Sequence, residues 1–197
     1  MTLDLRTHEI VERRMVARYV QPGDLVLECG GGIGAVTRVL LDAGACVTTY
    51  EPGALQFYDL KQLAAVYPAC APQQAALADH DGEIPLHCYD DEVWFADRTT
   101  SLGGHVPIRT VTVRARSFYD ELAREPWTGL VLDIEGAEHA LLAAARFPPS
   151  LRWIVAELHG PPDQLARTLA AVTAPFRLDA IEVNQVYLVV GWTRCAS

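Results

Sequence analysis

A glycine-rich segment, Gly30-Gly31-Gly32-Ile33-Gly34, is the feature that most constrains the fold. It follows residues 25–29, a short apolar run that predicts a buried strand. It leads into residues 33–43, whose apolar spacing predicts a helix ended by Gly44. Glycine permits a sharp turn and leaves the backbone open to a ligand, because it has no Cβ. The adjoining helix N-terminus offers free N–H groups and the positive end of a dipole.

Strand-like and helix-like segments alternate along the rest of the chain. Helical spacing of apolar residues predicts helices at residues 5–20, 54–66, 137–146 and 163–173. Short β-rich runs predict strands at residues 46–50, 130–133 and 153–158. The last two runs, 176–183 and 186–192, predict an antiparallel hairpin at one edge of the sheet. We therefore expect an α/β, Rossmann-like fold with a mostly parallel, doubly wound sheet.

The domain organisation follows from length and from one atypical segment. A chain of 197 residues is suited to one domain, so residues 1–197 are expected to form a single unit. Residues 1–22 form a predicted N-terminal helical extension. Residues of about 70–116 combine short strand-like runs with a glycine-containing loop at 99–104. We interpret this segment as an insertion that decorates the sheet.

Charge and composition exclude several classes of function. A formal net charge of -9 argues against nonspecific binding to nucleic acid, which needs a basic surface. No apolar run is long enough for a membrane helix, and the N-terminus lacks the apolar core of a signal peptide, so the cytoplasm is the expected location. The five cysteines include no CxxC pair, which disfavours a disulfide framework or a zinc site. Cys29 and Cys46 are expected to pack as small apolar side chains.

Two acids beside the glycine turn bear on the class of ligand. Gly30, Gly32 and Ala35 also match the fingerprint of nicotinamide dinucleotide binding, and Glu51, after the next strand, suits the ribose of either cofactor. Glu28 distinguishes between the two cofactors. A carboxylate facing the turn repels the pyrophosphate of a dinucleotide but attracts the ammonium and sulfonium groups of S-adenosylmethionine. The residues favour S-adenosylmethionine. A nicotinamide-dependent oxidoreductase and a glycine turn without ligand remain the alternatives.

The segment Asp133-Ile134-Glu135-Gly136-Ala137-Glu138 resembles the D-x-E-G-A-E motif of the FkbM family of methyltransferases. Four other segments resemble that family's motifs in the same order: Val26–Gly34, Tyr50–Pro52, Ala75–Gly82 and Ala156–His159. The resemblance covers residues of about 24–160. It departs at Gly32 and Gly53, where relatives often have asparagine.

This resemblance implies the fold of class I methyltransferases, S-adenosylmethionine as cofactor, and O-methylation of a small-molecule or glycosyl hydroxyl. It implies that Glu51 holds the ribose hydroxyls and that Ala76 and Leu77 flank the adenine. The methionine and ribose portions would be lined by Glu28, Gly30, Gly32 and Gly34.

Three residues at or just past strand ends are the predicted catalytic group. In an open α/β sheet the ligand crevice lies at the carboxyl ends of the strands, so Asp133, Glu157 and His159 should converge. A hydroxyl acceptor needs a base, for which His159 or Asp133 is the candidate, with Glu157 orienting it or the substrate. Alternatively, Asp133 and Glu157 could hold a divalent metal such as Mg²⁺.

Other interpretations of these segments stay open. Glu138 can be explained equally well as an acid that stabilises a helix N-terminus or as a catalytic residue. His139 is expected to be a surface or packing residue. A non-catalytic domain that has kept the fold is a third functional class. The presence of every acid in its expected place disfavours it.

Overall fold

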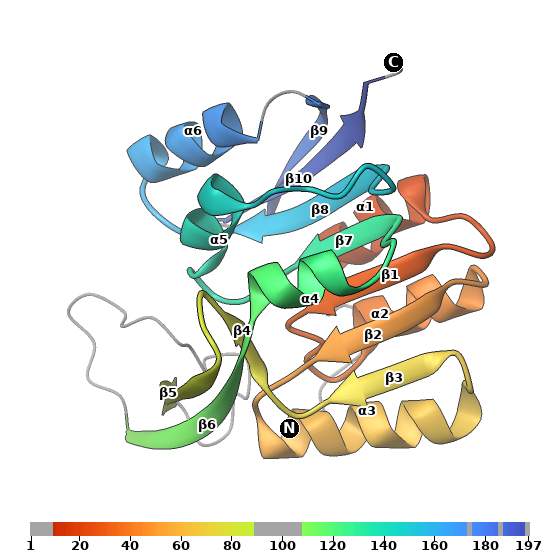
Figure 1. Ribbon diagram of the computed structural model, residues 1–197, viewed down its shortest axis with the longest axis vertical. Coiled ribbons are helices and arrows are strands. Elements are labelled where there is room, and N and C mark those ends of the chain that lie inside the picture. The colour runs from red at the N-terminus through yellow and green to blue at the C-terminus, as the bar shows by residue number, and fades with distance from the viewer. Residues whose placement is uncertain (1–9, 89–107, 173–174, 185–186, 196–197) are drawn as a thin grey trace.

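The computed structural model describes residues 10–88, 108–172, 175–184 and 187–195. Its centre is a seven-stranded sheet with the strand order β3-β2-β1-β7-β8-β10-β9 (Figure 1). These strands are β1 (Leu25–Cys29), β2 (Cys46–Tyr50), β3 (Cys70–Gln73), β7 (Gly129–Leu132), β8 (Trp153–Leu158), β9 (Phe176–Asn184) and β10 (Tyr187–Arg194).

The sheet is parallel except at β10. Strand β1 pairs in parallel with β2 and with β7, and β7 pairs in parallel with β8. Strand β10 is antiparallel to both β8 and β9. Because β9 ends at Asn184 and β10 begins at Tyr187, the short connection joins them as antiparallel neighbours. The predicted doubly wound sheet with a C-terminal antiparallel hairpin is confirmed.

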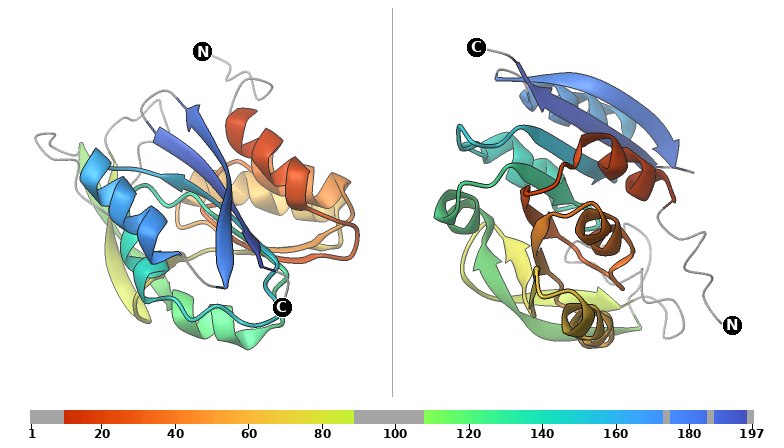
Figure 2. Two further views of the ribbon diagram at one scale, coloured as in Figure 1. Left: turned by 90° about the horizontal axis from the view of Figure 1, so that it is seen from above. Right: turned by 90° about the vertical axis from the view of Figure 1, so that its right-hand side faces the viewer.

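Helices cover both faces of the main sheet (Figure 2). One face carries α1 (Ile10–Tyr19), α2 (Ala35–Asp42) and α3 (Ala54–Val66), and the other carries α4 (Phe118–Arg124), α5 (Glu138–Ala144) and α6 (Pro162–Ala171). None of the described helices is long and apolar enough to cross a membrane.

Strand residues alternate between two apolar cores. Val26, Val131 and Val155 pack in the core with α1 and α2, while Leu27 and Leu130 belong to the core with α4 and α5. Burial on both faces explains why the strands are continuous apolar runs in the sequence.

The segment of residues 70–116 differs from the prediction. Its first four residues, β3, pair in parallel with β2 and form an edge of the main sheet. The rest contains β4 (Ala76–Ala78), β5 (Gly82–Cys88) and β6 (Arg109–Ser117), which make a separate three-stranded sheet. The short run of β3 includes Pro72, which weakens the strand signal but is tolerated on an edge strand. The predicted loop at 99–104 and residues 5–9 of the predicted first helix lie outside the described residues.

The two cysteines predicted to be buried differ from each other. Cys29 is fully buried at the end of β1, as predicted. Cys46 is exposed, so that prediction is wrong. Cys46 is the first residue of β2, and the strand begins at the rim of the sheet before the covering helices bury it. All five cysteines lie in the described part of the chain, and no disulfide joins them.

Candidate functional site at the carboxyl edge of the sheet

The glycine turn lies between the ends of β1, β2 and β7. The backbone N–H groups of Gly30 and Gly31 both donate to the carbonyl of Tyr50, at 2.9 and 3.0 Å. Gly30 has a φ of 86°, and a Cβ built on it would lie 1.8 Å from the carbonyl oxygen of Asp133. Only glycine therefore fits position 30. Its missing side chain lets the turn pack directly against the residue that follows β7.

Glu51 fastens this turn to the loop after β2. One carboxylate oxygen of Glu51 accepts from the N–H of Gly32 at 2.9 Å, and the other accepts from the N–H of Gly53 at 2.7 Å. The side chain is buried, so its position is fixed before any ligand arrives. The amides of Gly32 and Gly53 thus both bind Glu51.

Glu28 lies beneath the turn. It is 1% exposed, and its Oε2 accepts a hydrogen bond from the hydroxyl of Thr37 in α2 at 2.6 Å. The sequence predicted that this carboxylate lies on the ligand side of the turn. In the structure one of its oxygens ties the end of β1 to the helix that follows, and position 28 points to the same sheet face as Val26. Contact of Glu28 with a cofactor stays a prediction.

The two residues predicted to flank adenine lie on β4. Ala76 is 4% and Leu77 is 3% exposed. Leu77 belongs to the apolar core that also contains Phe118, and Ala76 pairs with Ala115 of β6. Their contact with an adenine ring stays a prediction.

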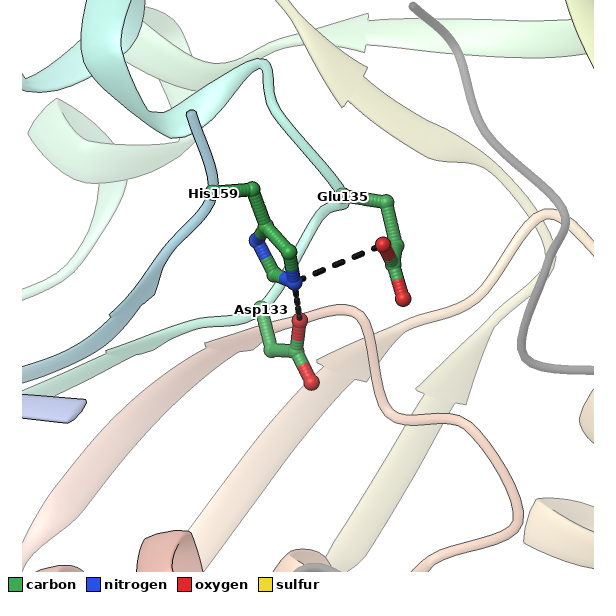
Figure 3. A group of neighbouring side chains, drawn as sticks. All are labelled: Asp133, Glu135 and His159. Carbon is green, nitrogen blue, oxygen red and sulfur yellow. Dashed lines mark ion pairs between the residues drawn. The ribbon is translucent and has the colours of Figure 1, made fainter. Parts of the chain in front are cut away.

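Acidic side chains surround His159 at the ends of β7 and β8 (Figure 3). Nε2 of His159 lies 3.9 Å from a carboxylate oxygen of Asp133 and 3.5 Å from one of Glu157. The predicted convergence of these three residues is therefore confirmed. It arises because Leu132 and Ala156 are partners in parallel strands, whose ends share one edge. Glu135 joins the group, with an oxygen 3.4 Å from the same nitrogen.

Glu138, the first residue of α5, fixes the imidazole from the other side. Its Oε1 lies 2.5 Å from Nδ1 of His159 and accepts the backbone N–H of the same residue at 3.2 Å. Its Oε2 accepts the N–H of Gly136 at 2.6 Å. An ionised carboxylate can only accept, so Nδ1 carries the proton. Glu138 is fully buried, and it both starts the helix and orients His159.

His139 adds a second support. Its Nε2 lies 2.5 Å from the carbonyl oxygen of His159, and its Nδ1 lies 2.5 Å from the hydroxyl of Thr168 in α6. His139 is buried. The expectation of a packing residue is thus correct, and its contacts reach the backbone of the site.

Glu135 has an unusual backbone conformation. Its φ is 59°, in the left-handed region, and it is the one residue other than glycine with positive φ in the described chain. Such a conformation costs on the order of 1 kcal/mol and tends to occur at functional sites. It places Glu135 in the loop between β7 and α5 with its carboxylate beside His159 (Figure 3).

Glu12 of α1 is a site residue that sequence reasoning missed. It is 3% exposed and makes a hydrogen bond with Glu157. Burial, this hydrogen bond and the negative charge of Asp133 raise the pKa of Glu157 to about 11. These causes all favour the protonated form of Glu157. The available signal was a charged residue on the buried stripe that Glu12 shares with Met15 and Val16.

No protein-family model and no curated protein sequence matches the chain. Solved structures match it over most of its length. Fibrillarin from Aeropyrum pernix, in complex with natively bound S-adenosyl-L-methionine, is 12% identical, with a TM-score of 0.59 over 93% of this chain and 74% of that one. The ribosomal protein L11 methylase of Lactobacillus delbrueckii subsp. bulgaricus is 13% identical, with a TM-score of 0.58 over 95% and 79%. An rRNA methylase from Streptococcus thermophilus is 10% identical, with a TM-score of 0.54 over 94% and 95%.

These likenesses show the fold. The chain has the Rossmann-like fold of class I methyltransferases, as the sequence predicted.

Proposed function

We propose that the chain is an S-adenosylmethionine-dependent methyltransferase whose site lies at the carboxyl edge of the main sheet. One observation carries the proposal: the glycine turn is in contact with both halves of that site. Gly32 donates to Glu51, and Gly30 packs against the carbonyl of Asp133. The turn therefore joins a candidate cofactor cradle to the cluster around His159. The motifs that resemble the FkbM family support the same activity.

The residues at this edge suit S-adenosylmethionine by their charge. The cofactor carries an ammonium, a sulfonium and ribose hydroxyls, and it has no phosphate. Glu51 places a fixed carboxylate at the end of β2, where it can accept from ribose hydroxyls. Asp133 and Glu135 add negative charge on the other side of the turn. A pyrophosphate would be repelled by the same groups.

The strand order also favours this cofactor over a nicotinamide dinucleotide. The usual dinucleotide-binding sheet has six parallel strands in the order 3-2-1-4-5-6. Here an antiparallel strand, β10, lies between β8 and β9.

When bound, S-adenosylmethionine supplies a methyl group already activated by positive sulfur. The chain's own residues must then hold the acceptor in line and accept its proton. Asp133 is suited to this, because its side chain is 27% exposed whereas that of His159 is 4% exposed. The raised pKa of Glu157 favours its protonated form, which suits it to donate a hydrogen bond that orients the acceptor or Asp133. His159 supports Asp133 from within the cluster.

The acceptor we propose is a hydroxyl of a small molecule or glycosyl group. The formal charge of -9 and the carboxylates at the site disfavour a polyanionic acceptor. Two of the similar structures are named as methylases of rRNA and of a ribosomal protein, so both acceptor classes belong in the test.

Isothermal titration with S-adenosylhomocysteine tests the proposal. We expect saturable binding to the unmodified chain, at least tenfold weaker binding to Glu51→Ala, and unchanged binding to Glu125→Ala, which removes an exposed carboxylate at the end of α4. Circular dichroism confirms that each variant is folded. Absence of binding, or equal binding by Glu51→Ala, would overturn the assignment, as would saturable binding of NADH.

Turnover is measured with radiolabelled cofactor against three acceptor pools: small glycosides, ribosomal RNA and ribosomal proteins. Labelling of glycosides alone supports the proposed acceptor. Labelling of RNA or protein would refute the proposed acceptor but would still support methyltransferase activity. Binding of cofactor without labelling in any pool favours the non-catalytic alternative.

A further inference from the structure

We infer that Asp133, Glu135 and His159 form a binding site for a divalent transition-metal ion, with Glu138 orienting the histidine ligand. This inference deepens the proposed function, because the site lies at the same edge of the sheet. It differs from the sequence-based hypothesis of Mg²⁺ held by Asp133 and Glu157, since a different carboxylate and an imidazole now supply ligands.

The separations between the ligand atoms fit one ion. Nε2 of His159 lies 3.4 Å from Oε2 of Glu135 and 3.9 Å from Oδ1 of Asp133, and all three ligand atoms lie within 4.8 Å of one another. Bonds of about 2.0–2.2 Å place two ligands of one ion about 3–4.4 Å apart. Small rotations of the carboxylates close the remaining difference.

The state of His159 is an independent observation that points to a cation. Its side chain is 4% exposed, and its Nδ1 proton is directed to Glu138. Among the described residues, Nε2 makes no hydrogen bond, although carboxyl oxygens of Glu135 and Asp133 lie 3.4 and 3.9 Å from it. A cation between Nε2 and these oxygens would give the buried nitrogen a partner, and a carboxylate behind the other ring nitrogen is the usual support of a metal-binding histidine.

The backbone of Glu135 brings its carboxylate to the cluster. A non-glycine residue keeps a left-handed conformation, with φ 59°, in the loop that carries its carboxylate to Nε2. Gly136, which follows, donates its N–H to Glu138, so one short loop orders both a ligand and the support of another. The loop's conformation thus serves the cluster.

The donor set selects the kind of ion. Mg²⁺ prefers a set of oxygen ligands alone, whereas imidazole is a good ligand for Zn²⁺, Fe²⁺ and other first-row transition dications. A site that combines carboxylates with an imidazole therefore binds these ions more tightly than it binds Mg²⁺. We therefore assign the site to a first-row transition dication in preference to Mg²⁺. Such an ion would offset the negative charge of the cluster and lower the pKa of a hydroxyl brought to it.

The second oxygen of Asp133 points away from Nε2, toward the outside of the cluster (Figure 3).

The competing explanation is a protonated His159 that pairs with the carboxylates without any metal. A metal titration separates the two. Chelator-treated full-length protein is titrated with Mn²⁺, and the free ion is followed by electron paramagnetic resonance, in the absence of any cofactor. We expect one ion per chain, at least tenfold weaker binding to Glu135→Gln, no change in Glu125→Gln, and no displacement by a tenfold excess of Mg²⁺.

A measurement on the unmodified protein guards against misfolding of the variant. Addition of Zn²⁺ is expected to shift the ¹⁵N resonance of Nε2 of His159 much more than that of Nδ1. Failure to bind Mn²⁺, binding unaffected by Glu135→Gln, displacement by Mg²⁺, or an unshifted Nε2 resonance would each overturn the inference. Binding of S-adenosylhomocysteine, measured separately, decides the proposed function, so the two can fail independently.

Discussion

Nδ1 of His159 lies 2.5 Å from a fully buried carboxylate oxygen of Glu138. The two residues come from different elements, since His159 follows β8 and Glu138 begins α5. Because the same carboxylate also accepts the backbone N–H of His159, both the ring and the main chain of the histidine are fixed. The remaining nitrogen, Nε2, is thereby directed at Asp133, Glu135 and Glu157.

The first prediction concerns this contact. Glu138→Gln keeps the shape of the side chain but leaves one acceptor oxygen where the carboxylate has two, so it cannot accept from both the imidazole and the N–H of Gly136. We expect the ring to populate both tautomers and the unfolding free energy to fall by about 1–3 kcal/mol. The ¹⁵N resonances of the imidazole report the tautomer. Binding of S-adenosylhomocysteine should be unchanged, because Glu51 lies on the other side of the turn. An unaltered tautomer would show that Glu138 does not position the ring.

The second prediction concerns the turn. Gly30→Ala adds a Cβ at 1.8 Å from the carbonyl oxygen of Asp133, on a backbone with φ 86°. Gly23→Ala is a matched control, because Gly23 has a φ of 84° but no atom within 4 Å of the added Cβ. We expect the control to lose about 1–2 kcal/mol of unfolding free energy from conformation alone. Gly30→Ala should lose clearly more, since backbone must also move. Equal losses in urea unfolding would contradict the close approach.

The third prediction concerns Asp24, a buried acid before β1. Its carboxylate accepts from the N–H of Gln21 at 2.9 Å, from the hydroxyl of Thr128 at 2.7 Å and from the indole of Trp153 at 3.1 Å, and it pairs with Arg152. Burial acts to raise the pKa of Asp24, but these hydrogen bonds outweigh it and lower the pKa below the ordinary value. Asp24→Asn should cost about 2–3 kcal/mol at pH 7.

The pH dependence of that loss follows from the sign of the shift. A lowered pKa in the folded state means that the stabilisation is complete above the unfolded pKa and disappears as pH falls through the folded one. The difference between Asp24→Asn and the unmodified chain should therefore shrink below about pH 4. Asp163→Asn is the control, because Asp163 is 67% exposed and its pair with Arg167 contributes little. A loss independent of pH down to acid unfolding would contradict the assignment.

The fourth prediction concerns Glu12. Glu12→Gln leaves an amide that can donate to Glu157 and removes one acidic group from the cluster, so the pKa of Glu157 should fall from its raised value. A raised folded pKa stabilises the chain at low pH, and this stabilisation is lost as pH rises. The unfolding free energy of Glu12→Gln should therefore decline less steeply than that of the unmodified chain as pH approaches the raised pKa of Glu157, about 11. Urea unfolding at a series of pH values from 7 up to that range measures this, and equal slopes throughout would contradict the contact between the two acids.

The sequence by itself determined the features that are encoded within a few residues. Alternating apolar strands and helices predicted the doubly wound sheet, and two apolar runs joined by a short link predicted the antiparallel hairpin. The convergence of Asp133, Glu157 and His159 was also predictable, because each lies at or just past the end of a parallel strand and such strands end at one edge. The same rule predicted that Glu51 lies at this edge, just past the end of β2.

Tertiary structure alone decided which groups meet across elements. Glu12 reaches Glu157 only because α1 packs against the end of β8, and nothing local in either segment specifies that contact. The place of Glu28 beneath the turn depends on Thr37 of α2, and the reach of Glu135 depends on one left-handed φ. Local patterns fix the type of each element through short-range sterics and apolar periodicity. The partners of a buried carboxylate depend on how whole helices and strands pack, which no short stretch of sequence contains.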